Sequence, residues 1–243
     1  MAVRFDAAGD RLQITANLPD YNGNYTWIVW ASRSSGTLDV ILDIGSSTAS
    51  MDHFGFINST GNLFMETDGG SGGYGYVQDA VARSTDTWYF FALRRSSATL
   101  LELLAGSLTV APAVVLTLTQ SNATRAAANS LHFSEDATPA YGFNGKVGPA
   151  LFFTRALSDG EVTAQANAIR PLDTTNLYGW WPMFPGSGER TLDYSGNGNN
   201  LSENGTLTDE APPPVGWGAP TGFWSVSAAA PPAGNPWYAY AQM

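Results

Sequence analysis

Short runs of apolar residues, separated by clusters of Gly, Asn, Asp and Ser, repeat along most of the chain. The runs are rich in β-branched and aromatic residues, which favour strands, and the separating clusters have the composition of turns. This pattern predicts an all-β protein. The predicted strands begin at Arg11 (RLQIT), Tyr25 (YTWIVWAS), Thr37 (TLDVILDI), Phe54 (FGFIN), Asn62 (NLFMET), Thr87 (TWYFFALRR), Val114 (VVLTLTQ), Ser130 (SLHFSE), Lys146 (KVGPALFFTR) and Leu177 (LYGWWPM).

Two places in this series need a separate interpretation. Ser59, Thr60 and Gly61 divide the runs that begin at Phe54 and Asn62, and a loop of this length and composition predicts a hairpin. The run TLLELLAG near Leu100 is compatible with a strand or with a buried helix, because periodicity does not distinguish the two in so short a segment. We assign it to a strand.

One segment carries the signals of an α-helix. In LSDGEVTAQANAIRP, Ser158 is the expected N-cap and Glu161 completes a capping box, while Leu157 and Val162 form a hydrophobic staple. Pro171 stops the pattern. The prediction is one helix of about ten residues lying against a sandwich, which argues against a fold of alternating strands and helices.

Composition and charge limit the possible partners. Only 13% of the residues are charged, and the formal net charge of -10 would repel a phosphate backbone or an anionic membrane. We therefore expect no nucleic-acid partner and no membrane partner. The absence of cysteine excludes disulfides, thiol nucleophiles and thiolate metal sites. No signal peptide or membrane-spanning segment is predicted.

The residues from 209 onward differ from the rest in being rich in proline and aromatic residues. Proline resists regular sheet, yet the aromatic content is too high for a free linker. We predict a sandwich domain over residues 1–208 and a C-terminal arm over residues 209–243. The arm either wraps its own sandwich or packs on a neighbouring subunit, and its contact residues are expected to be Trp217, Phe223, Trp224, Trp237, Tyr238 and Tyr240.

Four segments, in order, resemble laminin-G-like, pentraxin-related domains of the concanavalin A-like lectin/glucanase superfamily. They are the opening VRFDAAGDRLQITANLP, the run YTWIVWAS, the run TWYFFALRR and the stretch GFNGKVGPALFFTRALSDGEV. The positions that match the family pattern are Phe5, Asp6, Asp10, Leu12, Trp30, Trp88, Gly145, Val147, Arg155, Ala156, Leu157, Ser158 and Glu161. The resemblance runs from Val3 to Val162 and implies two antiparallel sheets packed as a jelly roll. It indicates fold more than activity.

Some members of that superfamily are retaining glycoside hydrolases, which need two carboxylates close together. Glu66 and Asp68 are two residues apart, but Gly69 and Gly70 stand where a third acid would belong. Asp39 and Asp43 share a face of one predicted strand and are interpreted as solvated acids. His53 and His132 are far apart in sequence and are interpreted as surface or partly buried imidazoles. Catalysis is therefore not expected.

Two kinds of binding site remain. The loop from Asp193 to Asn199 places oxygen-bearing side chains at alternate positions, which suits Ca²⁺, and Asp193, Asn197 and Asn199 are the candidate ligands. The alternative is a turn whose side chains hydrogen-bond their own backbone. For glycans, aromatic rings beside amides offer stacking and hydrogen bonds, and the candidates are Tyr21, Asn22, Tyr74 and Tyr76.

These observations lead to three hypotheses. The first is a non-enzymatic structural protein of an assembled particle, such as a capsid-decoration or tail-associated protein of a bacteriophage virion. Its partners would be other virion proteins or copies of itself, and it would be found in the virion. The second is a carbohydrate-binding or adhesion module, extracellular and calcium-dependent in one form, whose partners would be cell-surface glycans. The third is a polysaccharide hydrolase or lyase.

Overall fold

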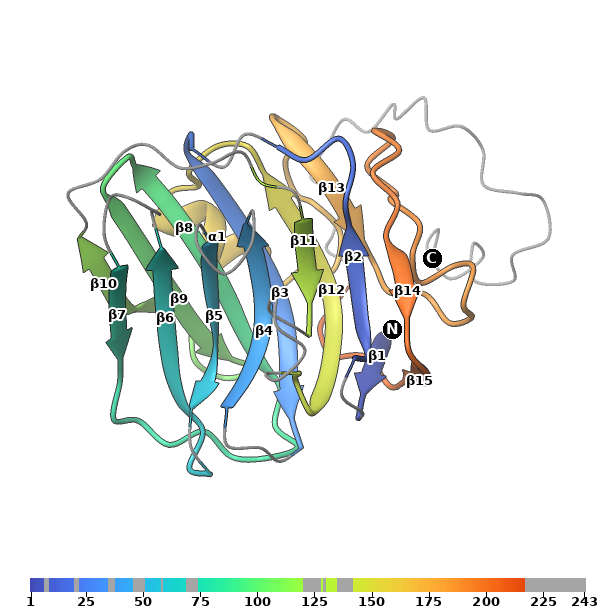
Figure 1. The fold of residues 1–243 in the computed structure, drawn as a ribbon, viewed down its shortest axis with the longest axis horizontal. Helices are drawn as coiled ribbons and strands as arrows, with labels where there is room; N and C mark the ends of the chain where they lie inside the picture. The colour runs from blue at the N-terminus through green and yellow to red at the C-terminus, as the bar shows by residue number, and fades with distance from the viewer. Residues whose placement is uncertain are drawn as a thin grey trace.

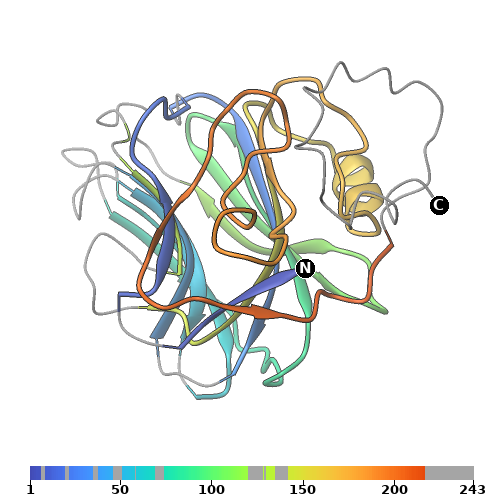
Figure 2. The ribbon, with the colours of Figure 1, turned by 90° about the vertical axis from the view of Figure 1, so that its right-hand side faces the viewer.

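Two antiparallel β-sheets pack face to face in a jelly-roll sandwich, with one helix on the outside of one sheet (Figures 1 and 2). The computed structural model describes residues 1–6, 9–19, 22–34, 38–45, 51–57, 59–68, 74–119, 128, 130–134 and 142–216, without the side chains of Leu38, Asp68 and Tyr74. Sheet A has the strand order β10-β9-β8-β3-β12-β1-β15, with β13 also paired to β12, and sheet B has the order β14-β2-β11-β4-β5-β6-β7.

The bounds of the elements follow the chain. They are β1 (Ala2–Phe5), β2 (Arg11–Ile14), β3 (Tyr25–Arg33), β4 (Leu38–Gly45), β5 (Met51–Ile57), β6 (Asn62–Asp68), β7 (Tyr74–Gln78), β8 (Tyr89–Ser97), β9 (Leu100–Ser107), β10 (Ala113–Thr119), β11 (Ser130–Phe133), β12 (Gly145–Phe153), α1 (Asp159–Gln165), β13 (Leu177–Trp181), β14 (Ser202–Asn204) and β15 (Thr208–Glu210).

The predicted all-β fold is confirmed. Every run assigned to a strand forms one, including the ambiguous run at Leu100, and β5 and β6 form the expected hairpin. The structure adds β1, β7, β14 and β15, which the apolar pattern did not reveal. Tyr74 and Tyr76, which we expected in a glycine-rich loop, belong to strand β7. None of the helices in the described ranges is long and apolar enough to cross a membrane.

The main core lies between the two sheets and is built around aromatic rings. The Trp27 ring meets Phe133 of sheet B and Phe152 of its own sheet edge to face, with centroids 5.2 and 5.3 Å apart. Edge-to-face ring pairs stabilise the fold further, beyond the free energy gained by burying their large apolar surfaces. The Asp52 carboxylate of sheet B also joins the two sheets, because it contacts two residues of sheet A. The Tyr25 hydroxyl donates to Asp52 Oδ2 at 2.5 Å, and Arg95 Nη1 lies 3.7 Å from the same oxygen.

A second, smaller core fills the space between the outer face of sheet A and helix α1. It contains Trp30 and Phe90 from the sheet, and Leu157 and Val162 from the helix region, as the hydrophobic staple predicts. Helix α1 ends near Gln165, well before Pro171. The predicted length was therefore too great, because the chain leaves the helix in a turn that Gln165 stabilises through its side-chain amide.

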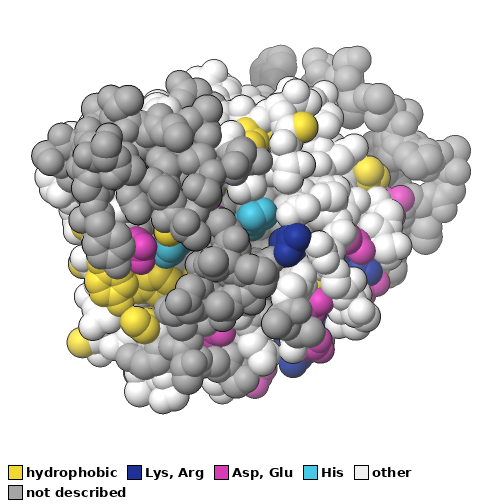
Figure 3. Space-filling view, viewed as in Figure 1, with side chains coloured by type: hydrophobic (Ala, Val, Ile, Leu, Met, Phe, Trp, Pro, Cys, Tyr) yellow, Lys and Arg dark blue, Asp and Glu magenta, His cyan; other side chains and the backbone are white. Residues whose placement is uncertain are grey.

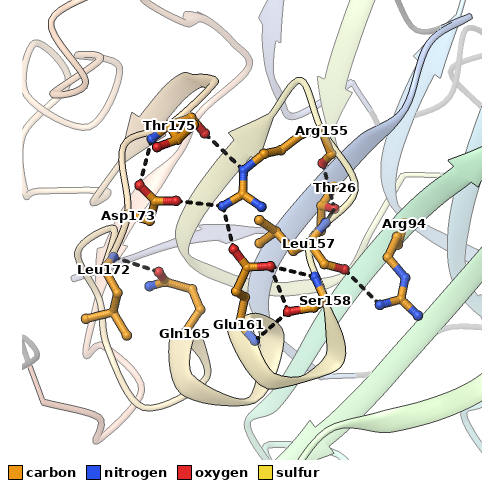
Figure 4. Close-up of polar contacts among 10 residues, drawn as sticks. All are labelled: Thr26, Arg94, Arg155, Leu157, Ser158, Glu161, Gln165, Leu172, Asp173 and Thr175. Atoms are coloured by element: carbon orange, nitrogen blue, oxygen red, sulfur yellow. Dashed lines mark hydrogen bonds and ion pairs between the residues drawn. The ribbon is translucent and has the colours of Figure 1, made fainter.

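Polar contacts fix the start of α1 against the sheet (Figure 4). Ser158 and Glu161 form the predicted capping box, with each side chain bonded to the backbone N–H of the other residue. Arg155 bridges Glu161 and Asp173 at 2.7 Å each. Arg94 donates to the carbonyl of Leu157. The helix thus has a fixed position over sheet A.

The sandwich extends past the predicted boundary at residue 208. Strand β15 pairs with β1, and its Asp209 lies opposite Val3. Farther on, Val215 packs against the second core and the carbonyl of Gly216 accepts from the N–H of Ile169. Residues 209–216 therefore lie on the sandwich. The six arm residues Trp217, Phe223, Trp224, Trp237, Tyr238 and Tyr240 are outside the described residues.

Candidate functional site

A row of polar residues crosses the outer face of sheet B. The strand register places His132 of β11 opposite Asp43 of β4, Asp43 opposite His53 of β5, His53 opposite Glu66 of β6, and Glu66 opposite Tyr76 of β7. Residues that are directly opposite one another share a face of a sheet. The flanking positions point into the core, so these side chains point away from it.

The members of this row are close enough to interact. Both histidines lie beside Asp43, with His53 Nδ1 3.9 Å from Oδ1 and His132 Nδ1 3.8 Å from Oδ2. On its other side, His53 Nε2 is 3.4 Å from Glu66 Oε2. Asp43 is 1% exposed and both imidazoles are buried. Two carboxylates and two imidazoles thus alternate along the row, which provides both hydrogen-bond acceptors and potential donors.

An aromatic surface adjoins this polar row. The Tyr76 ring is 37% exposed and stacks on Phe64, with centroids 6.1 Å apart and an angle of 23° between planes. Its hydroxyl donates to Gln78 Oε1 at 2.8 Å. Burial and the Glu66 carboxylate raise the pKa of Tyr76, so the phenol stays protonated at neutral pH. In Figure 3, which faces sheet B, hydrophobic, acidic and histidine side chains lie side by side over this part of the sheet.

The acids of β4 do not share a face as we expected. A β-bulge between Val40 and Leu42 reverses the alternation, so Asp39 lies opposite Phe56 on the core side while Asp43 is on the outer side. Neither is a solvated acid, because both are buried. Burial raises the pKa of Asp39 to about 6, although the Asn144 backbone N–H and the Arg33 guanidinium act in the opposite direction.

The interpretation of the histidines also needs correction. Sequence separation suggested two unrelated imidazoles at or near the surface, whereas both are buried against one carboxylate. Within the described part of the chain, no three His, Asp or Glu side chains are arranged to hold a metal ion. Glu66 is in the row, but the side chain of Asp68, the acid two residues away, is outside the described residues.

The loop that carries Asp193 protects the edge of strand β13. The Asp193 carboxylate accepts four hydrogen bonds, from the backbone N–H groups of Trp180, Ser195 and Asn199 and from the Ser195 hydroxyl. The amides of Asn197 and Asn199 donate to carbonyls of the same strand. These are the bonds of the turn alternative, and they use the acceptor positions through which Asp193 would bind Ca²⁺. Calcium binding by Asp193, Asn197 and Asn199 stays a prediction.

The structure describes only some of the candidate glycan-binding residues. Tyr76 is exposed beside the polar row, and Asn22 is half-buried in the turn before β3. Tyr21 and the side chain of Tyr74 are outside the described residues. Sequence reasoning missed Asp43, His53 and His132 as site residues, because only the pairing of strands brings them together.

Comparison with known proteins identifies structures with the same fold but finds no close relative in sequence. No family model matches the chain, and no curated protein matches it. A protein of Bacteroides ovatus ATCC 8483 proposed to bind carbohydrate is similar in structure, with a TM-score of 0.58 and 12% identity over 89% of this chain and 61% of that one.

Two further solved structures share the architecture. The heptameric SAP-like pentraxin of Limulus polyphemus has a TM-score of 0.53 and 12% identity, over 68% of this chain and 81% of its own. The enzymatically active domain of tailspike protein 2 from bacteriophage CBA120 has a TM-score of 0.55 and 12% identity, over 69% of this chain and 28% of its own. Identities this low indicate the fold alone. The chain has the concanavalin A-like, pentraxin-type jelly-roll fold that its sequence resembles.

Proposed function

We propose that this chain is a non-enzymatic glycan-binding protein, and that it binds through the outer face of sheet B around Tyr76. The observation that carries the proposal is an exposed aromatic ring, held flat against Phe64, at the end of a row of carboxylates and imidazoles. A pyranose presents one apolar face and a rim of hydroxyls, so it needs a ring for stacking and polar groups beside it. Tyr76, Gln78 and Glu66 supply these groups.

The structural relatives are consistent with this proposal, but their low sequence identity means that they are not its main support. One is itself proposed to bind carbohydrate, and the match to the tailspike covers less than a third of that enzyme. The row supports the non-enzymatic part of the proposal, because the His53 imidazole fills the space between the Asp43 and Glu66 carboxylates that a pair of catalytic acids would leave open to a sugar.

Glycan-array screening of the full chain, followed by titration calorimetry, tests the proposal. Replacing Tyr76 by Ala removes the stacking surface and is expected to weaken binding at least tenfold, whereas Tyr76→Phe keeps the ring and should lose only a few-fold. Thr174→Ala, which shortens an exposed side chain in the loop before β13, is the control. Calcium and EDTA arms test the predicted metal. An array without a hit, or equal binding by Tyr76→Ala, would refute the proposal.

As a second role, we propose that the chain acts on the surface of an assembled particle such as a bacteriophage virion. The structural similarity to a bacteriophage tailspike domain favours it, as does the aromatic composition of residues 217–243. Immunogold labelling of purified particles from the source of the chain is the direct test. Labelled intact particles are expected, and particles without label would exclude the role.

A further inference from the structure

The ends of the two sheets differ in how their outermost strands are protected. Unpaired strand edges invite pairing with other chains, and proteins guard them with charges, bulges or covering loops. In sheet A, β15 carries Asp209 and Glu210, and in sheet B, β14 carries Glu203. The free side of β13 is covered by the loop around Asp193. Each of these three edges is therefore protected. The remaining edge of sheet B, β7, contains no charged residue.

Strand β10, at the opposite end of sheet A, lacks such charges (Figure 1). Its sequence, AVVLTLT, contains no charged residue. Among the described strands it pairs only with β9, and β7 and β6 of sheet B lie close to it without pairing. A bulge lies between Val114 and Leu116, after which the pairing with β9 is regular to Thr119. Seven uncharged residues of this kind have the composition of strands that pair between chains. The chain also has a single lysine, Lys146, and it lies elsewhere.

Exposed apolar side chains gather on the same hairpin. Leu108, Val110 and Val114 are 45%, 62% and 39% exposed, and they make up three of the five large hydrophobic side chains that are exposed in the described chain. Clusters of this kind are a common feature of surfaces that associate. The turn before β10 thus adds apolar area to the uncharged edge.

We propose that β10 is an association surface on which a second copy of this chain adds its own β10, antiparallel, to extend sheet A across the dimer. A second copy is the partner because the strand is chemically self-complementary: about a two-fold axis, every pairing joins aliphatic or threonine side chains. The net charge of -10 makes two copies repel one another over most of their surface. That repulsion is weakest where the contacting segment is uncharged.

Sedimentation velocity of the full chain over a wide concentration range measures the association. Thr117 is exposed on β10, and Thr117→Lys would place two positive charges near the two-fold axis. The dissociation constant of the dimer is expected to rise at least tenfold. Thr208→Lys, an exposed threonine on the edge strand β15, is the matched control and should leave the dimer unchanged.

The absence of cysteine supplies a second, independent readout. With Thr117→Cys, a short bismaleimide is expected to join two chains, whereas with Thr208→Cys it should not. A chain that stays monomeric at every concentration would overturn the proposal. A dimer that Thr208→Lys weakens as much as Thr117→Lys, or that cross-links equally at both positions, would do the same. Glycan binding is not measured in either experiment, so the two proposals fail or succeed separately.

Discussion

The buried carboxyl of Asp39 predicts a pH dependence of stability that one substitution should remove. Its pKa is raised to about 6, from 3.8, mainly because the side chain lies in the core with 3% exposure. The folded protein therefore binds this proton more tightly than the unfolded chain. The stabilisation is complete below about pH 4 and is lost as the pH rises through about 6. A rise of this size corresponds to at most about 3 kcal/mol.

Urea denaturation of the wild type and of Asp39→Asn, at several pH values between about 4 and 7.5, measures the effect. All other titrating groups are common to both proteins, so the difference between the two unfolding free energies isolates Asp39. This difference should shift in favour of the variant by up to about 3 kcal/mol across that interval. Asp6→Asn, at an exposed acid, controls for the loss of one negative charge. A difference that stays constant with pH would show that the reasoning about Asp39 is wrong.

Two other substitutions test the polar contacts that hold the sandwich together. The ion pair with Arg155 and the Ser158 N–H lower the pKa of Glu161 to about 2, so its stabilisation is present above pH 4.5 and lost at lower pH. Because the side chain is 41% exposed, Glu161→Gln should cost only about 1 kcal/mol at pH 7, and thermal unfolding should show the gap closing below about pH 4. Tyr25→Phe removes a hydrogen bond to the fully buried Asp52 and should cost about 2 kcal/mol in urea denaturation; a loss under about 0.5 kcal/mol would contradict this assignment.

The parts of the fold that the sequence predicts are those with local causes. The capping box of α1 needs only two residues three positions apart, and it forms as expected. Strand β7 was not predicted, because Gly75 interrupts its apolar pattern and a glycine-rich segment precedes it. Strands β14 and β15 are three residues long and are too short for any periodicity.

The candidate site was harder to predict because it depends on register between strands. The bulge in β4 decides which of Asp39 and Asp43 faces outward, and no local pattern marks it. His53 and His132 then meet Asp43 only because β11, β4 and β5 are neighbours in sheet B. Tyr76 could be proposed because an aromatic residue among polar neighbours is a local signal, although its partner Phe64 could not.

The position of β1 has a consequence for the order in which the chain can fold. This first strand lies between β12 and β15, and its partners are Gly145–Val147 on one side and Thr208–Glu210 on the other. During synthesis, the N-terminal strand leaves the ribosome long before either neighbour exists, so sheet A is completed only when almost all of the sandwich has been made. Contacts between such distant segments slow folding. The apolar residues of β1 then lack both partner strands until β12 has been made, and during that time they are available to chaperones.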